Sequence, residues 1–99
     1  MLNGQEALAM IHADNTLRQH GVGPDTAQIL TLRVVLGRSL QEVAGVTGIS
    51  PASVRQMEDR AIREMRDETF DTLTALATFQ NPSFDWHRSV TRARAARVA

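Results

Sequence analysis

Residues 39–66 read SLQEVAGVTGISPASVRQMEDRAIREMR, and this stretch contains two closely spaced helix starts. The first is Ser39, with Glu42 three positions later. This is the spacing of a capping box, in which the hydroxyl and the carboxylate each accept a hydrogen bond from the other residue's backbone N–H. The second is Ser50 followed by Pro51, because proline has no N–H to lose and its fixed φ suits the first helical position. The stretch therefore predicts two consecutive helices.

The residues between the two starts predict how the helices pack. Gly48 can adopt a positive φ at little cost, so it is the expected turn residue. Ala44, Gly48 and Val54 are spaced as in a helix-turn-helix, whose tight turn gives a steep crossing and a protruding second helix. The apolar residues agree, because they form one stripe on each helix (Leu40, Val43, Ala44 and Thr47; then Val54, Met57, Ala61, Ile62 and Met65). An αα-hairpin that only builds a small core is the alternative.

The run from Leu32 to Arg66 resembles region 4 of bacterial sigma factors, and a looser likeness reaches back to Asp25. Within it, residues 54–66 are similar to the primary sigma factors and residues 48–54 to the extracytoplasmic-function group. Region 4 of these proteins reads the promoter −35 element and contacts the flap of the RNA polymerase β subunit. The resemblance therefore implies double-stranded DNA and RNA polymerase as partners.

Base edges are contacted by residues near the start and on the outward face of a recognition helix. In the predicted helix 50–66 these residues are Ser50, Ala52, Ser53, Arg55, Gln56 and Asp59. Arg55 and Gln56 are the strongest candidates, because arginine binds guanine and glutamine binds adenine with two hydrogen bonds. They also match the Arg-Gln pair of the primary sigma helix. Backbone N–H groups around Ser53 can bind a phosphate at the positive helix end.

Phosphate contacts are expected from a second set of residues, which consists of Arg38, Arg60, Arg63, Arg88, Arg92 and Arg94. One feature departs from the sigma pattern. Primary sigma factors have an Arg-Glu-Arg run before the position of Val54, whereas this chain has Pro51, Ala52 and Ser53, which cannot make bidentate base contacts. Either the protein reads a different sequence, or the fold has been reused to bind another protein.

Length and composition narrow the class of protein. A chain of 99 residues suits one domain, or one domain with a tail. The 11 basic residues, all arginine, balance 11 acidic ones, and the absence of cysteine rules out disulfides and thiolate zinc sites. No apolar run is long enough for a membrane span, and no signal peptide is visible. We expect a cytoplasmic protein that is not an enzyme and that holds no cofactor or metal; His12 and His20 are too far apart for one helix face.

The rest of the chain predicts three supporting helices. Residues 5–19 form the first, with Leu8, Ile11 and Leu17 as its apolar positions. Residues 24–36 are apolar nearly all round, so this helix should be central and buried. Residues 67–79 lack Gly and Pro and continue the helical period beyond Arg66. Their apolar face (Phe70, Leu73, Leu76 or Ala77, Phe79 or Gln80) either packs on the first helix or forms a homodimer seam, which we favour slightly.

The chain from Asn81 onward predicts a separate basic tail. Ser83 can cap a final helix with a small apolar anchor (Phe84, Trp86 and Val90), and arginines follow. One interpretation is that the tail binds along a phosphate backbone or an acidic patch on a partner. The other is that it is a solvated terminus. We therefore divide the chain into a helix-turn-helix domain at residues 1–80 and a basic helix or tail at residues 81–99.

These observations predict an all-α protein with a small four- to five-helix domain that contains a helix-turn-helix. The expected function is sequence-specific DNA binding in transcriptional regulation, with helix 50–66 in the major groove. The alternative is a protein-interaction module with a sigma-like fold, which binds RNA polymerase or a transcription regulator without reading DNA. The zero net charge and the missing base-reading residues favour that alternative.

Overall fold

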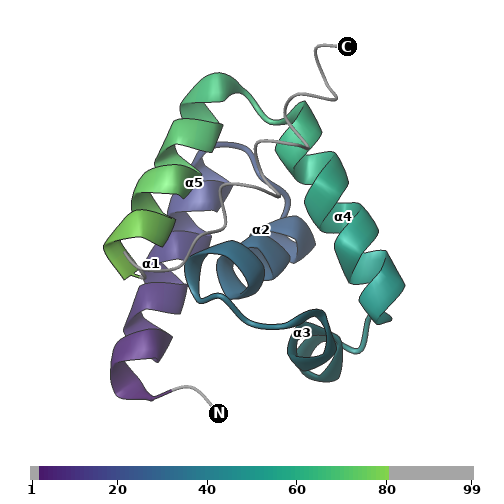
Figure 1. Ribbon diagram of the computed structural model, residues 1–99. Coiled ribbons are helices and arrows are strands. Elements are labelled where there is room, and N and C mark those ends of the chain that lie inside the picture. The colour runs from purple at the N-terminus through teal and green to yellow at the C-terminus, as the bar shows by residue number, and fades with distance from the viewer. Residues whose placement is uncertain (1–2, 81–99) are drawn as a thin grey trace.

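The computed structural model describes residues 3–80, which contain five α-helices, one π-helical turn and no strand (Figure 1). The predicted all-α, four- to five-helix fold is therefore confirmed. In chain order the elements are α1 (Gly4–Gln19), α2 (Pro24–Leu30), the π-helical turn η1 (Thr31–Val35), α3 (Leu40–Thr47), α4 (Pro51–Glu64) and α5 (Asp67–Gln80).

The α2–η1 segment is the centre of the fold, as its apolar sequence predicted. Figure 1 shows α2 between α5 on one side and α4 on the other, and the segment contacts all four other helices. At η1 the helix widens, because the N–H of Leu36 bonds the carbonyl of Thr31 five residues earlier at 3.0 Å. Gly37 then takes φ +67° and ends the segment. Its buried residues are Ala27, Ile29, Leu30, Thr31, Leu32, Val34, Val35 and Leu36.

Helix α1 begins at a capping box that the sequence analysis missed. The side chain of Asn3 accepts a bond from the N–H of Glu6 at 2.8 Å, and the Glu6 carboxylate accepts one from the N–H of Asn3 at 3.4 Å. The apolar face was also assigned wrongly in part, because Leu8 and Ile11 point to solvent. The helix instead packs through small and flexible residues that share one side, namely Ala9, Met10, Ala13 and Leu17.

The two predicted helix starts of the helix-turn-helix are confirmed. The hydroxyl of Ser39 accepts a bond from the N–H of Glu42 at 3.1 Å, and the Glu42 carboxylate accepts one from the N–H of Ser39 at 3.2 Å. Hydrogen bonding of the Glu42 carboxylate to the backbone N–H of Ser39 and then to its side chain lowers the pKa of Glu42. Ser50 caps α4 with Pro51 at its first position. Gly48 ends α3 at φ +75°, with its N–H bonded to the carbonyl of Ala44 at 2.9 Å.

Replacing Gly48 by alanine should destabilise the domain by about 1–2 kcal/mol, because an L side chain is strained in the left-handed region. Gly45→Ala is a matched control, since Gly45 lies inside α3 and a Cβ there would meet no atom within 4 Å. That change should stabilise the domain by up to about 1 kcal/mol, because alanine is the better helix former. Urea unfolding of both variants checks the opposite signs; a stable Gly48→Ala variant would contradict this account of the turn.

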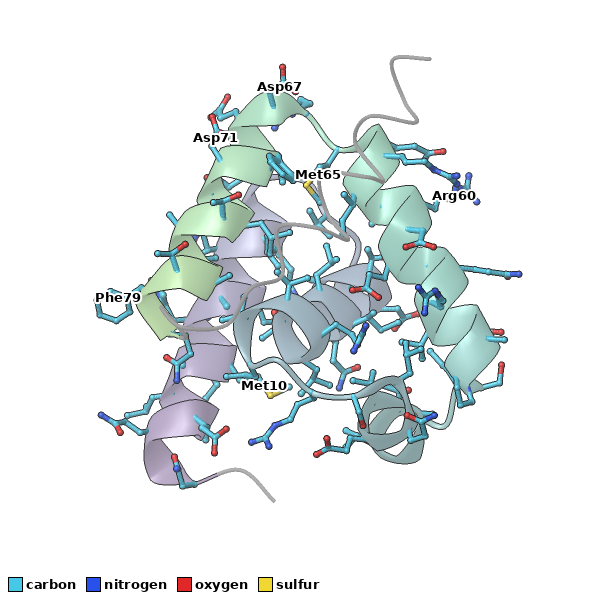
Figure 2. The ribbon with its side chains drawn as sticks, viewed as in Figure 1. Met10, Arg60, Met65, Asp67, Asp71 and Phe79 are labelled. Atoms are coloured by element: carbon cyan, nitrogen blue, oxygen red, sulfur yellow. The ribbon has the colours of Figure 1, made fainter. Side chains whose placement is uncertain are left out.

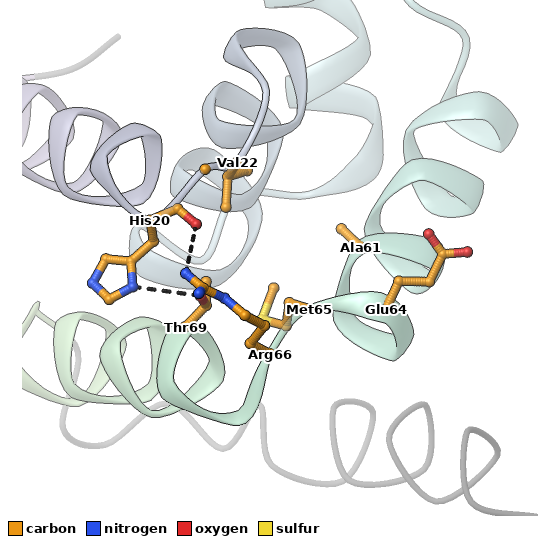
Figure 3. Close-up of a pocket in the computed structure, with 8 residues that line it drawn as sticks. His20, Val22, Ala61, Glu64, Met65, Arg66 and Thr69 are labelled. Atoms are coloured by element: carbon orange, nitrogen blue, oxygen red, sulfur yellow. Dashed lines mark hydrogen bonds between the residues drawn. The ribbon is translucent and has the colours of Figure 1, made fainter.

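The helix-turn-helix ends earlier than the continuous helical pattern suggested. Met65 has an extended backbone at φ −69° and ψ 152°, so α4 stops at Glu64 and α5 is a separate helix. A shallow pocket of about 310 Å³ lies at this junction, and Figure 3 shows the contacts beside it. Arg66 donates to the carbonyl of His20 at 3.3 Å, and the His20 ring lies 3.4 Å from the hydroxyl of Thr69. These contacts join the end of α1 to the start of α5.

Helix α5 closes the core of its own chain. It packs against α1 and η1, and Thr69, Leu73 and Ala77 are buried there. The predicted face therefore serves intramolecular packing through Leu73 and Ala77, which was the alternative to a homodimer seam, but Phe79 was assigned to this face wrongly, because its side chain is 89% exposed. A homodimer stays a prediction, and these buried residues are not free to form it.

Candidate nucleic-acid interface

Helix α4 has one face in the core and one face in solvent. The stripe predicted to be apolar packs inward: Val54, Ile62 and Met65 are buried, and Met57 and Ala61 are partly buried against them. Figure 2 shows Met65 pointing into the interior and Arg60 pointing away from it. Because this stripe packs on the core, the opposite side of α4 is open to a partner.

The outward face of α4 brings together four residues that recur at helical spacing. Ala52, Gln56 and Arg63 are exposed and Asp59 is half-buried, and the spacing of four, three and four residues puts them on one side of the helix. Gln56 lies in the middle of this outward face. Arg55 is exposed as well, but its position is rotated about 100° from that of Gln56, toward one flank. Ser53 is half-buried on the other flank, so the predicted base-contacting residues span the outward face and both flanks.

The first turn of α4 already uses part of its hydrogen-bonding capacity. The hydroxyl of Ser50 accepts a bond from the N–H of Ser53 at 3.2 Å, and the two hydroxyls lie 2.9 Å apart. The Ser53 amide, which the sequence analysis assigned to a phosphate, is therefore occupied by the cap.

Two of the predicted phosphate-contacting arginines lie on α4 with exposed side chains. Arg60 is 3.3 Å from Glu64 in a largely exposed pair one helical turn apart. A solvent-exposed pair of this kind is worth well under about 1 kcal/mol, so Arg60 can leave it at little cost. Arg63 is exposed on the outward face of α4, together with Ala52 and Gln56. Both guanidinium groups can reach a polyanion that approaches the outward face.

Arg38 has a different environment from the other arginines. It forms an ion pair with Glu6 of α1, and its guanidinium lies 3.8 Å from the carboxylate of Glu42 in α3. The side chain thus joins α1 to the start of the helix-turn-helix, so a phosphate would have to compete with two carboxylates for it. The remaining predicted contacts, Arg88, Arg92 and Arg94, lie outside the described residues.

A partly buried ion pair that the sequence analysis did not identify fixes α4 against the core. Arg33 of η1 donates to the carboxylate of Glu58 at 3.1 Å, and the two side chains are only 23% and 14% exposed. Arg33 also donates to the carbonyl of Arg38 at 2.7 Å. One signal was present in the sequence: Glu58 lies four residues after Val54, on the apolar stripe of α4, where a charge needs a partner.

Burial of Glu58 outweighs the attraction of Arg33, so the pKa of this carboxyl is raised above its ordinary value of 4.5. A raised folded-state pKa means that the contribution of Glu58 to stability is present below pH 4.5 and is lost as the pH rises through the folded pKa. The pair therefore orients α4 rather than adding much net stability at neutral pH.

Glu58→Gln should remove this pH dependence. Glutamine resembles the protonated carboxyl, so the stability of the variant relative to the wild type should rise as the pH is raised from about 4 to about 7. Chemical denaturation of both proteins across this pH range measures the difference between their free energies of unfolding. The contributions of the other carboxyl groups are the same in both proteins, so they cancel in this difference. Two parallel stability profiles would show that Glu58 is not perturbed.

Other kinds of site have little support in the part of the chain that is described. Residues 3–80 contain no cluster of three histidine or acidic side chains that could hold a metal ion. No helix within the same range combines the length and the hydropathy that crossing a membrane requires.

In a comparison with protein families, residues 23–65 match the family model described as sigma-70, region 4. The matched range covers α2, η1, α3 and α4, and it stops at the break at Met65, before α5. Comparison with curated proteins and with solved structures gave no significant match. The resemblance expected from the sequence is confirmed by the family match, and it coincides with the elements that present the outward face of α4. Residues 23–65 of this chain therefore form a helix-turn-helix segment that resembles region 4 of the sigma-70 factors, with α1 before it and α5 after it.

Proposed function

We propose that the protein is a sequence-specific DNA-binding regulator of transcription and that α4 enters the major groove. The observation that carries the proposal is the outward face of α4, where exposed polar residues and arginines stand opposite a stripe buried in the core. The cap at Ser50 and the Arg33–Glu58 pair hold this face in place. The matched family supports a role in transcription, and on that basis we infer a cytoplasmic protein that acts by binding rather than by catalysis.

Each residue on this surface has a definite chemical role in the proposal. Gln56 reads adenine from the centre of the face, and Arg55 reads guanine from the flank. Asp59 can accept a hydrogen bond from the amino group of cytosine, and Ala52 is small enough to let the helix approach the bases closely. Arg60 and Arg63 bind phosphates beside the groove.

Selection from randomised duplex DNA, followed by a salt titration of the selected sequences, tests the proposal. We expect convergence on one motif and a log–log salt slope that reflects the few phosphates bound by α4. A two-fold symmetric motif would also indicate that the protein binds as a homodimer. Binding without sequence preference, or no binding at all, would refute the proposal.

A second function has an observation in its favour. Pro51 and Ala52 replace the base-reading side chains of primary sigma factors, and the carboxylates of Glu6, Glu42, Glu58 and Glu64 engage three of the arginines near the helix-turn-helix. A surface with so little free positive charge suits a protein partner. If selection gives no motif, binding of the purified protein to RNA polymerase, with and without the substitution Gln56→Ala, is the next measurement.

A further inference from the structure

The outer face of α5 is exposed along its whole length, although the helix is part of the core. Glu68, Asp71, Ala75 and Phe79 recur at spacings of three, four and four residues, so they share one side, and all four are exposed. Phe79 is 89% exposed, which is a costly position for a phenyl ring in water. Figure 2 shows Phe79 pointing away from the helices at one end of α5 and Asp71 near the other end.

This face has an apolar end and an acidic end. At the apolar end is Phe79. Helices α5 and α1 are antiparallel (Figure 1), and the ring of His20, at the end of α1, lies 3.4 Å from the hydroxyls of both Thr69 and Thr72 near the start of α5. The end of α5 is thus beside the early turns of α1, where Leu8 is 70% exposed. At the acidic end are Glu68 and Asp71.

The sequence that follows α5 has the complementary order. It begins after Gln80, which is next to Phe79 in the sequence, and its first residues are Asn81-Pro82-Ser83. Apolar residues come next, and basic residues come after them. At helical spacings of four, four and three residues, one side of it would present Trp86, Val90, Arg94 and Arg97. Aligned antiparallel to α5, these four residues fall opposite Phe79, Ala75, Asp71 and Glu68 in that order.

We infer that residues 84–97 fold back along the outer face of α5 and dock there. Trp86 packs on Phe79 and Val90 packs on Ala75, while Arg94 and Arg97 pair with Asp71 and Glu68. Apolar contact and charge complementarity both favour this one register. A connection of a few residues is also typical of antiparallel helix pairs, and it gives the tail a high effective concentration at this face.

The docking has a consequence for DNA binding. Figure 1 shows α5 and α4 on opposite sides of α2. The arginines of a tail that lies on α5 are therefore directed away from the groove in which α4 would lie. This inference assigns Arg94 to a carboxylate of its own chain, in place of the DNA phosphate expected from the sequence.

Disulfide trapping tests the register, because the chain has no cysteine of its own. The full-length variant Ala75→Cys/Val90→Cys should form an intrachain disulfide under mild oxidation. The control Val46→Cys/Val90→Cys, with Val46 exposed on α3, should not. Of the three replaced positions, Ala75 and Val46 are exposed, and Val90 lies outside the described residues. Circular dichroism should therefore show an unchanged helical content.

The other outcomes overturn the inference. Disulfide-linked dimers of Ala75→Cys/Val90→Cys would show that a second copy of the chain covers this face. Equal trapping of both pairs, or no trapping of either, would show that the tail does not dock on α5.

A charge exchange tests the ionic part with a different readout. Trp86 is the single tryptophan, so its fluorescence reports on the tail. Asp71→Arg should make Trp86 more accessible to acrylamide and shift its emission to the red, and Asp71→Arg/Arg94→Asp should restore the wild-type values. If the double variant is no better protected than the single one, Asp71 and Arg94 are not partners and the proposed register is wrong.

Discussion

Replacing Leu73 by alanine should lower the free energy of unfolding by about 2–5 kcal/mol, the range for deleting a fully buried leucine side chain. Leu73 is 0% exposed, in the contact of α5 with α1 and η1. The surrounding side chains belong to three separate elements, so they cannot collapse easily around the cavity. A loss of this size is a large part of the total stability of a small domain.

Leu8→Ala is the matched control, because the same atoms are deleted from a side chain that is 70% exposed. Its effect should stay within about 0.5 kcal/mol. Urea unfolding at several protein concentrations measures both variants. The midpoint of Leu73→Ala should not depend on concentration, because Leu73 packs within its own chain. A concentration-dependent midpoint, or equal losses for both variants, would contradict the assignment of α5 to the core.

Removing Arg55 or Gln56 should cost about 1–3 kcal/mol of affinity for the selected duplex in each case. The reason is that a bidentate contact in the major groove discriminates among bases, and its loss also leaves base edges unpaired. Arg55→Ala should relax the preference at one base pair, and Gln56→Ala should relax it at another. Arg63→Ala should instead weaken binding to all sequences alike and lower the salt slope by about 1, as expected for a phosphate contact.

Matched controls for these variants lie on α1. Arg18→Ala removes the same charge as Arg55→Ala, and Gln5→Ala removes the same amide as Gln56→Ala, in each case from an exposed position of another helix. Neither should change base preference. Equilibrium binding to the selected duplex and to its single-base variants distinguishes the outcomes. If Arg18→Ala weakens binding as much as Arg55→Ala, the docking through α4 is wrong.

The helix-turn-helix could be predicted from the sequence because its determinants are local. A capping box, a serine–proline helix start and a turn glycine each act within a few residues, and the apolar stripe of α4 repeats every three or four positions. The choice of Arg55, Gln56 and Arg63 as exposed residues followed from the same periodicity. These parts needed no knowledge of the rest of the chain.

The features that were missed depend on contacts between distant residues. Arg33 and Glu58 are 25 positions apart, so no local pattern links them. The ion pair of Arg38 with Glu6 spans 32 positions. The end of α4 at Met65 is followed by Arg66, whose contact with the carbonyl of His20 joins residues 46 positions apart and is visible only once α1 and α5 are side by side. Leu8 and Ile11 were expected on the apolar face of the first helix, but they are exposed because α1 packs through the side that carries Ala13 and Leu17.

The central claim is that the outward face of α4 is the surface that binds DNA. A titration of the isotopically labelled protein with its selected duplex, followed by backbone amide chemical shifts, tests it most directly. We expect the largest shifts from Ser50 to Arg63, with Gln56 at their centre, and little change along α1 and α5. Shifts concentrated on α1 or α5, with the amides of α4 unchanged, would contradict the account.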